Sequence, residues 1–312
     1  MADKQEKDRV MDDDGCYYMT EEEAKAFSKM AKPPHFDPAV VKNHKVDVPY
    51  GALPEQLLDI YLPESGEGPF PVVFYVHGGG WRIGSKTDSF MGGIIGLIDY
   101  GYAVLSVDYR LAPKTIFPEF LFDVKTAVRW ARAHAAEYKF DPNRFAMIGD
   151  SAGGHLALMI AFTTGRPEYA DESYGWPGVS DEVQAICDMY GVSLLTDSTR
   201  FFRESGVPRV RREKPGESHW GTLFGTDHED LLRLISPISL VHKNIPPVLI
   251  LQGMKDGAVA YQQSTLLADK ISEVCGKDRV KLILYEDRNH ADFGFNTKEN
   301  SDEIAAFFDS HL

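Results

Sequence analysis

The sequence predicts an α/β protein in which a mostly parallel, doubly wound sheet carries helices on both faces. Short apolar runs recur along the chain at 72–76, 103–107 and 145–148, and longer amphipathic segments separate them. Apolar runs of this length are typical of central parallel strands, which are covered on both faces. Strands that alternate with helices join into a parallel sheet through right-handed crossovers.

Composition excludes several classes of protein. The 312 residues are 43% hydrophobic and 26% charged, which fits a globular α/β domain with an extension and insertions. A formal net charge of −14 argues against nucleic acid and anionic membranes as partners. Three distant cysteines without a C-x-x-C predict neither a disulfide framework nor a structural zinc site. We expect a protein without metal or cofactor. The start lacks a signal-peptide core and no apolar run could span a bilayer, so we expect a cytoplasmic protein.

Residues 1–45 are predicted to form an N-terminal extension, either a lid or a contact in a homo-oligomer, ahead of a domain spanning 46–312. Within it, Thr20 and Glu23 have capping-box spacing, which predicts a helix up to about Met30. Segments 45–48 and 57–62 then predict an antiparallel hairpin, in which alternate residues of 57–62 face opposite ways.

Later segments continue the alternation of helices and strands. We expect helices over 89–100, 117–138, 261–274 and 299–312, strands over 183–190, 247–252 and 280–285, and a turn at Asp141-Pro142-Asn143. Segment 196–226 is too long for a plain connection, so it is interpreted as an insertion near the active site.

The stretch Gly149-Asp150-Ser151-Ala152-Gly153 fits the pattern G-x-S-x-G between an apolar strand and an apolar helical segment. This context is the one in which such a serine sits on a strained, tight turn with its hydroxyl exposed above the sheet. The small residues at 149 and 153 leave room for that turn. Ser151 is therefore the candidate nucleophile.

A serine nucleophile needs a base and an acid that orients the base. His290 and Asp256 each follow a predicted strand, in the chain order Ser–Asp–His expected on this architecture. Asp287 and Asp292 are the competing acids, but they lie so near His290 in sequence that only a tight local turn would let them reach its ring. We favour Asp256.

The negative charge that develops on an attacked carbonyl oxygen needs preorganised N–H donors. One candidate donor is the N–H of Ala152, at the start of the following helix. The stretch His77-Gly78-Gly79-Gly80-Trp81 follows an upstream apolar strand, and its glycines allow close backbone approach. We expect Gly79 and Gly80 to donate and His77 to hold the shape of the loop.

Together these residues resemble an α/β-hydrolase of the esterase/lipase type that carries an HGGG loop. The stretches Asp108-Tyr109-Arg110-Leu111-Ala112-Pro113 and Phe117-Pro118, with Asp123 and Trp130, agree with that resemblance from about residue 45 onward. It is most similar to acetyl-esterase and feruloyl-esterase-like carboxylesterases. That similarity implies a small-molecule ester substrate with a small acyl or hydroxycinnamoyl group, such as those on plant polysaccharide fragments.

The resemblance also leaves open points. Ala291-Asp292 stands where a glycine is expected after the catalytic histidine. Trp81, Asp150 and His155 are expected to border the substrate, although Trp81 is as readily a packing aromatic. Arylformamidase-like and peptidase-like serine hydrolases are the alternatives, together with a non-catalytic ligand receptor on the same fold.

Overall fold

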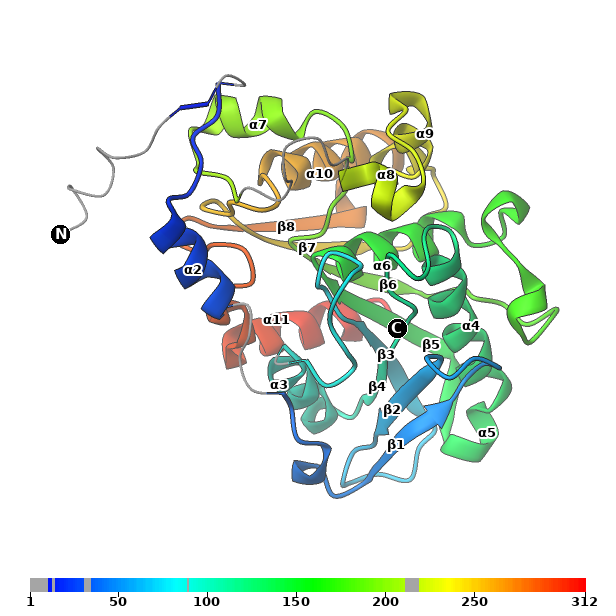
Figure 1. Cartoon of the computed structure of the whole chain (residues 1–312). Coiled ribbons are helices and arrows are strands. Elements are labelled where there is room, and N and C mark those ends of the chain that lie inside the picture. Colours follow the sequence, from blue (N-terminus) through cyan, green and yellow to red (C-terminus); the bar gives the residue numbers. More distant parts are fainter. Residues whose placement is uncertain (1–10, 13–14, 31–34, 89, 211–218) are drawn as a thin grey trace.

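The computed structural model describes residues 11–12, 15–30, 35–88, 90–210 and 219–312. Their centre is one eight-stranded sheet with the order β1-β2-β4-β3-β5-β6-β7-β8 (Figure 1). β2 runs antiparallel to β1 and β4, and the other neighbouring pairs are parallel. The predicted parallel sheet and its antiparallel hairpin are therefore confirmed. The strands are β1 (His44–Pro49), β2 (Leu57–Tyr61), β3 (Phe70–Val76), β4 (Ala103–Val107), β5 (Phe140–Asp150), β6 (Ala185–Met189), β7 (Val248–Gly253) and β8 (Val280–Tyr285).

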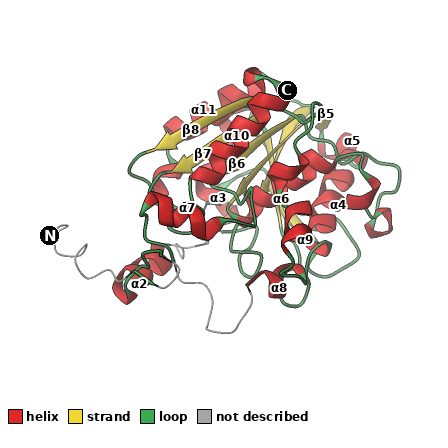
Figure 2. Ribbon diagram, turned by 90° about the horizontal axis from the view of Figure 1, so that it is seen from above, coloured by secondary structure: helices red, strands yellow, loops and turns green. Residues whose placement is uncertain are grey.

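Helices cover both faces of this sheet (Figure 2). Buried residues of α4, α6 and α10 pack in one apolar cluster, and those of α3 and α11 pack in a second cluster across the sheet. The helices are α2 (Glu21–Met30), α3 (Met91–Ile94), α4 (Glu119–Ala133), α5 (Ala135–Tyr138), α6 (Ala152–Thr163), α7 (Ser198–Ser205), α8 (His219–Phe224), α9 (Glu229–Leu234), α10 (Gln262–Cys275) and α11 (Lys298–Asp309).

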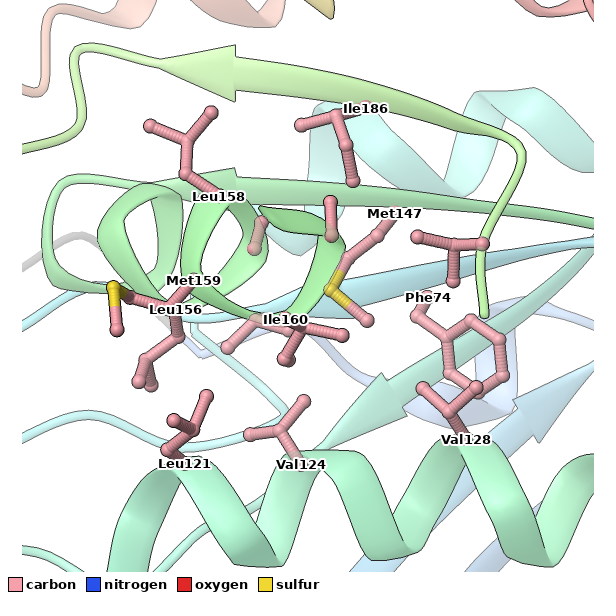
Figure 3. Close-up of a cluster of buried hydrophobic side chains, with 14 of the residues drawn as sticks. Phe74, Leu121, Val124, Val128, Met147, Leu156, Leu158, Met159, Ile160 and Ile186 are labelled. Atoms are coloured by element: carbon pink, nitrogen blue, oxygen red, sulfur yellow. The ribbon is translucent and has the colours of Figure 1, made fainter. Parts of the chain in front are cut away.

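Helix α6 lies at the middle of the first layer and is buried along its whole length. A helix that is apolar all round requires neighbours on every side. In Figure 3, Leu156 of α6 lies over Leu121 of α4, and Ile160 of α6 lies between Val124 of α4 and Met147 of β5. The element that follows Ser151 is thereby fixed to the centre of the sheet.

Three predicted helices or turns differ from those observed. The helix expected over 89–100 is a single α-helical turn, α3, followed by the 3₁₀ helix Ile95–Tyr100, and residue 89 lies outside the described part of the chain. The helix expected over 117–138 is divided at His134, whose Nδ1 and backbone N both lie within hydrogen-bonding distance of the Trp130 carbonyl oxygen. The turn expected at 141–143 lies inside β5, where Phe70 pairs with Phe140 but Val72 pairs with Phe145. The turn residues therefore form a bulge in a strand that continues beyond them.

Both faces of β2 are buried. Asp59 and Tyr61 are as fully buried as Leu58 and Ile60, because β2 lies between two strands and beneath both layers. The Asp59 carboxylate accepts hydrogen bonds from the Asp47 N–H and the Tyr61 hydroxyl. A buried carboxylate requires such partners.

Candidate active site

The nucleophile candidate sits between the end of β5 and the first residue of α6. Ser151 has φ 53° and ψ −115°, a strained conformation for a residue with a side chain. A Cβ at Gly149 would lie 2.1 Å from the Gly153 carbonyl oxygen, and one at Gly153 would lie 1.9 Å from that of Val76. Glycine is therefore required on both sides of the serine, as the motif predicts.

The structure brings together the three residues that the sequence selects. His290 Nε2 lies 2.9 Å from Ser151 Oγ, and His290 Nδ1 lies 2.7 Å from Asp256 Oδ2. A carboxylate only accepts, so Nδ1 carries the proton and Nε2 is free to accept the serine hydroxyl proton. The loops after β5, β7 and β8 supply the three side chains, and all three loops leave the same edge of the sheet.

Backbone and side-chain donors hold Asp256 in place. Its Oδ1 accepts from the N–H groups of Ala258 at 2.8 Å and Val259 at 2.7 Å, and its Oδ2 accepts from Gln252 Nε2 at 3.1 Å. The competing acid Asp292 is engaged elsewhere, because its Oδ1 accepts from the Gly294 N–H at the start of a short 3₁₀ helix.

Asp150 ties the glycine loop to the serine turn. Its Oδ1 accepts from the Gly78 N–H at 2.9 Å and from the Tyr75 hydroxyl at 2.8 Å. Burial raises the pKa of Asp150 to about 6. Asp150 immediately precedes Ser151, so these bonds fix the position of the loop after β3 relative to the candidate nucleophile.

The N–H groups proposed from the sequence as oxyanion donors remain available. Gly79 and Gly80 have φ values of 99° and 61°, which glycine adopts without strain. Within the described part of the chain, the N–H groups of Gly79, Gly80 and Ala152 have no hydrogen-bond acceptor. N–H groups without an acceptor suit an oxygen that acquires negative charge.

Two tyrosines support the site, and the sequence reasoning gave neither of them a role. The Tyr109 ring stacks on His77 with centroids 4.4 Å apart, and its hydroxyl donates to the His77 carbonyl oxygen at 2.9 Å. Tyr190 meets the His290 ring edge-on at 4.9 Å. Tyr109 lies in a stretch quoted for the resemblance, whereas nothing in the local sequence marks Tyr190.

The structure places the three predicted substrate-bordering side chains in the interior. Trp81, Asp150 and His155 are 1%, 5% and 0% exposed. The Trp81 ring packs perpendicular to those of His155 and Phe224, each at 5.2 Å between centroids. Burial lowers the pKa of His155 to about 4, and its Nε2 lies 3.0 Å from the Ile235 carbonyl oxygen. Direct contact of these residues with substrate stays a prediction.

Ala291, which stands where the resemblance expects glycine, has φ 54°. The backbone after His290 is thus in the left-handed region that favours glycine, and Ala291 adopts this conformation.

Two further properties concern the described residues as a set. None of their helices is long and apolar enough to cross a membrane. Across the same part of the chain, no group of three or more His, Cys, Asp or Glu side chains is placed to hold a metal ion.

Two esterases of Mycobacterium tuberculosis, LipC and LipQ, match 74% and 70% of this chain. Esterase LipC of Mycobacterium tuberculosis is 33% identical over 233 residues, covering 74% of this chain and 56% of LipC. This chain spans about half the length of the curated relatives it matches.

Solved structures show the same fold. A truncated carbohydrate esterase from gut microbiota superposes with a TM-score of 0.75 at 23% identity, covering 89% of this chain and 99% of its own. A bifunctional GH43-CE protein from Bacteroides eggerthii gives a TM-score of 0.74 at 28% identity, covering 86% of this chain and 38% of its own. The BD-FAE family model matches residues 58–271, more than half of the chain. The chain therefore belongs to the BD-FAE family and has the α/β-hydrolase fold.

Proposed function

We propose that this protein is a cofactor-free serine carboxylesterase. The observation that carries the proposal is the hydrogen-bonded series Ser151–His290–Asp256, at 2.9 and 2.7 Å. The named esterases among the relatives support it.

In the proposed reaction His290 Nε2 takes the Ser151 proton while Oγ attacks the ester carbonyl carbon. The carbonyl oxygen becomes an oxyanion, and the N–H groups of Gly79, Gly80 and Ala152 stabilise it. Collapse expels the alcohol, which receives the proton from His290, and leaves an acyl-serine. A water molecule activated by His290 then releases the carboxylic acid and regenerates Ser151.

Small acyl or hydroxycinnamoyl esters, including those on plant polysaccharide fragments, are the proposed substrates. Support comes from the family and from the carbohydrate esterase of similar structure. A panel of acetyl, butyryl and feruloyl esters, aminoacyl amides and N-formylkynurenine, given to the purified protein, tests this. Preferred turnover of the amide or the formamide would contradict it.

The test of mechanism is Ser151→Ala. We expect loss of p-nitrophenyl acetate hydrolysis by about 10³-fold or more, with little change in thermal unfolding. The control is Ser173→Ala, at an exposed position of the 3₁₀ helix Glu172–Tyr174, which should leave both unchanged. Turnover retained by Ser151→Ala would reject the nucleophile.

We also propose that the N-terminal extension and the insertion act together as a cap. Tyr17 O accepts from the Arg209 N–H at 2.9 Å, and the Met19 N–H donates to Arg209 O at 3.0 Å. Val210 N in turn donates to Gly257 O at 2.8 Å, directly beside Asp256. Both segments thus lie on the loop of the proposed catalytic acid. Residues 211–218 of the insertion lie outside the described part of the chain.

A further inference from the structure

We propose that Gln252, itself held by Ser264, is a positioning residue for Asp256. The proposal rests on the proposed function. Gln252 is the next-to-last residue of β7, and Ser264 lies in the first turn of α10. Gln252, Ser264 and Asp256 are at most 1% exposed, so water does not compete for their hydrogen bonds.

The contacts of Gln252 leave one orientation for its amide. Nε2 lies 3.0 Å from the Gly253 carbonyl oxygen and 3.1 Å from Asp256 Oδ2, both of which only accept. A flipped amide would place its oxygen against a carboxylate and a carbonyl. Oε1 instead faces Ser264 Oγ at 2.9 Å, and the serine hydroxyl donates to it.

This arrangement completes the set of donors around the carboxylate. The two loop N–H groups fix Oδ1, whereas Oδ2 is shared between His290 Nδ1 and Gln252 Nε2. With both oxygens held, the carboxylate plane is fixed and one lone pair of Oδ2 points at the imidazole. Gln252 also disperses part of the negative charge that would otherwise act on His290 alone.

Loss of the amide donor therefore has two consequences. The carboxylate becomes freer to rotate, which misaligns His290 for proton transfer. Its full charge then acts on the imidazolium, which favours the protonated and inactive form of the base. A residue with only a packing role would produce neither effect in a folded variant.

The experiment compares Gln252→Met, which keeps the side-chain volume and removes the donor, with the wild-type protein. We expect kcat for p-nitrophenyl acetate to fall about tenfold with KM little changed, because the interaction acts on the transition state. We also expect the midpoint of the acidic limb of kcat/KM against pH to rise by about half a pH unit. Ser264→Ala should lower kcat and raise this midpoint, each by less than Gln252→Met does. Ser264→Thr keeps the hydroxyl and should show the wild-type kcat and midpoint.

Gln263→Ala is the matched control. Gln263 is a neighbouring glutamine, 3% exposed, whose Oε1 accepts from the N–H groups of Ser193 and Leu194 and not from any group at Asp256. Gln263→Ala should reduce thermal stability without changing the midpoint of the acidic limb of kcat/KM against pH. A Gln252→Met variant that folds, keeps the wild-type kcat and shows the wild-type midpoint of the acidic limb of kcat/KM against pH overturns the proposal. If Gln252→Met fails to fold, Ser264→Ala decides by the same criteria.

A second readout separates this proposal from the proposed function. The downfield proton resonance of His290 Nδ1 reports its hydrogen bond to Asp256 without turnover. We expect it to shift or broaden in Gln252→Met and to stay unchanged in Gln263→Ala, and an unchanged resonance in Gln252→Met counts against the positioning role. An inactive wild-type protein would contradict only the esterase function, because this resonance still tests Gln252.

Discussion

Asp150 joins two parts of the site through one carboxylate oxygen. Its Oδ1 accepts from Gly78 N and the Tyr75 hydroxyl, and an asparagine in its place keeps that acceptor. We expect Asp150→Asn to retain kcat within about threefold and Asp150→Ala to lower it by about 10- to 100-fold, because alanine releases the glycine loop. Steady-state hydrolysis of p-nitrophenyl acetate measures both. Equal activity of the two variants would show that the tether is dispensable.

Ala291 provides a second test at the scale of one residue. Its φ of 54° disfavours any side chain by about 1 kcal/mol, and a β-branched side chain by more. We expect Ala291→Gly to leave the melting temperature unchanged or slightly higher, and Ala291→Val to lower it. Thermal unfolding of the two variants measures this. A stable Ala291→Val would mean that the loop relaxes out of this conformation.

Among the elements, the N-terminal segment depends on a small apolar cluster of its own. Cys16 is fully buried with Phe201 and Phe202 of α7 and with Ala260. A charge in that cluster is unfavourable, so Cys16→Asp should detach the segment from α7. If the segment caps the site, KM for esters rises about threefold or more while kcat changes little. The conservative Cys16→Ala serves as the control, and an unchanged KM in Cys16→Asp would contradict the cap.

The sequence predicted elements best where local chemistry determines them. Thr20 and Glu23 form the expected capping box, with Thr20 N donating to Glu23 Oε2 at 2.8 Å and Glu23 N donating to Thr20 Oγ1 at 3.2 Å. Strand 103–107 has the predicted bounds. In both cases the signal and the structure it determines lie within a few residues of each other.

Long-range contacts account for what sequence reasoning missed. The bulge in β5 depends on pairing with β3, and Gln252 Oε1 acquires its donor, Ser264 Oγ, only when α10 packs on the sheet. Tyr109 reaches His77 across 32 positions of the chain. No local pattern encodes these contacts, whereas the order and loop positions of Ser151, Asp256 and His290 follow from the strand pattern.

For the whole molecule, the buried Asp188 makes stability depend on pH. Burial raises its pKa from 3.8 to about 7, so the folded state binds a proton that the unfolded state has lost. The stability that this proton gives is complete below about pH 3.8 and falls as the pH rises, and its last part is lost as the pH passes through 7. Burial lowers the pKa of His155 to about 4, so this histidine makes stability fall as the pH decreases, but only below about pH 6.5.

Asp188→Asn removes this dependence and keeps an oxygen for the Gly191 N–H, which Asp188 Oδ1 accepts at 3.0 Å. Between pH 6.5 and 8 we expect the free energy of unfolding of the wild-type protein to fall by about 1 kcal/mol, which lowers its melting temperature by about 2 °C. We do not expect this decrease in the variant. Calorimetry at the two pH values measures the difference. Parallel decreases in the two proteins would assign the effect to other groups.

The sheet order has a consequence for how activity arises during synthesis. β3 and β5 lie side by side and carry the glycine loop and the serine turn, but β8, which precedes His290, is the last strand in the chain and an edge strand paired with β7. A growing polypeptide that has already built its nucleophile would therefore still lack its base. The proposed esterase becomes competent only when β8 docks beside β7 and brings His290 to Ser151.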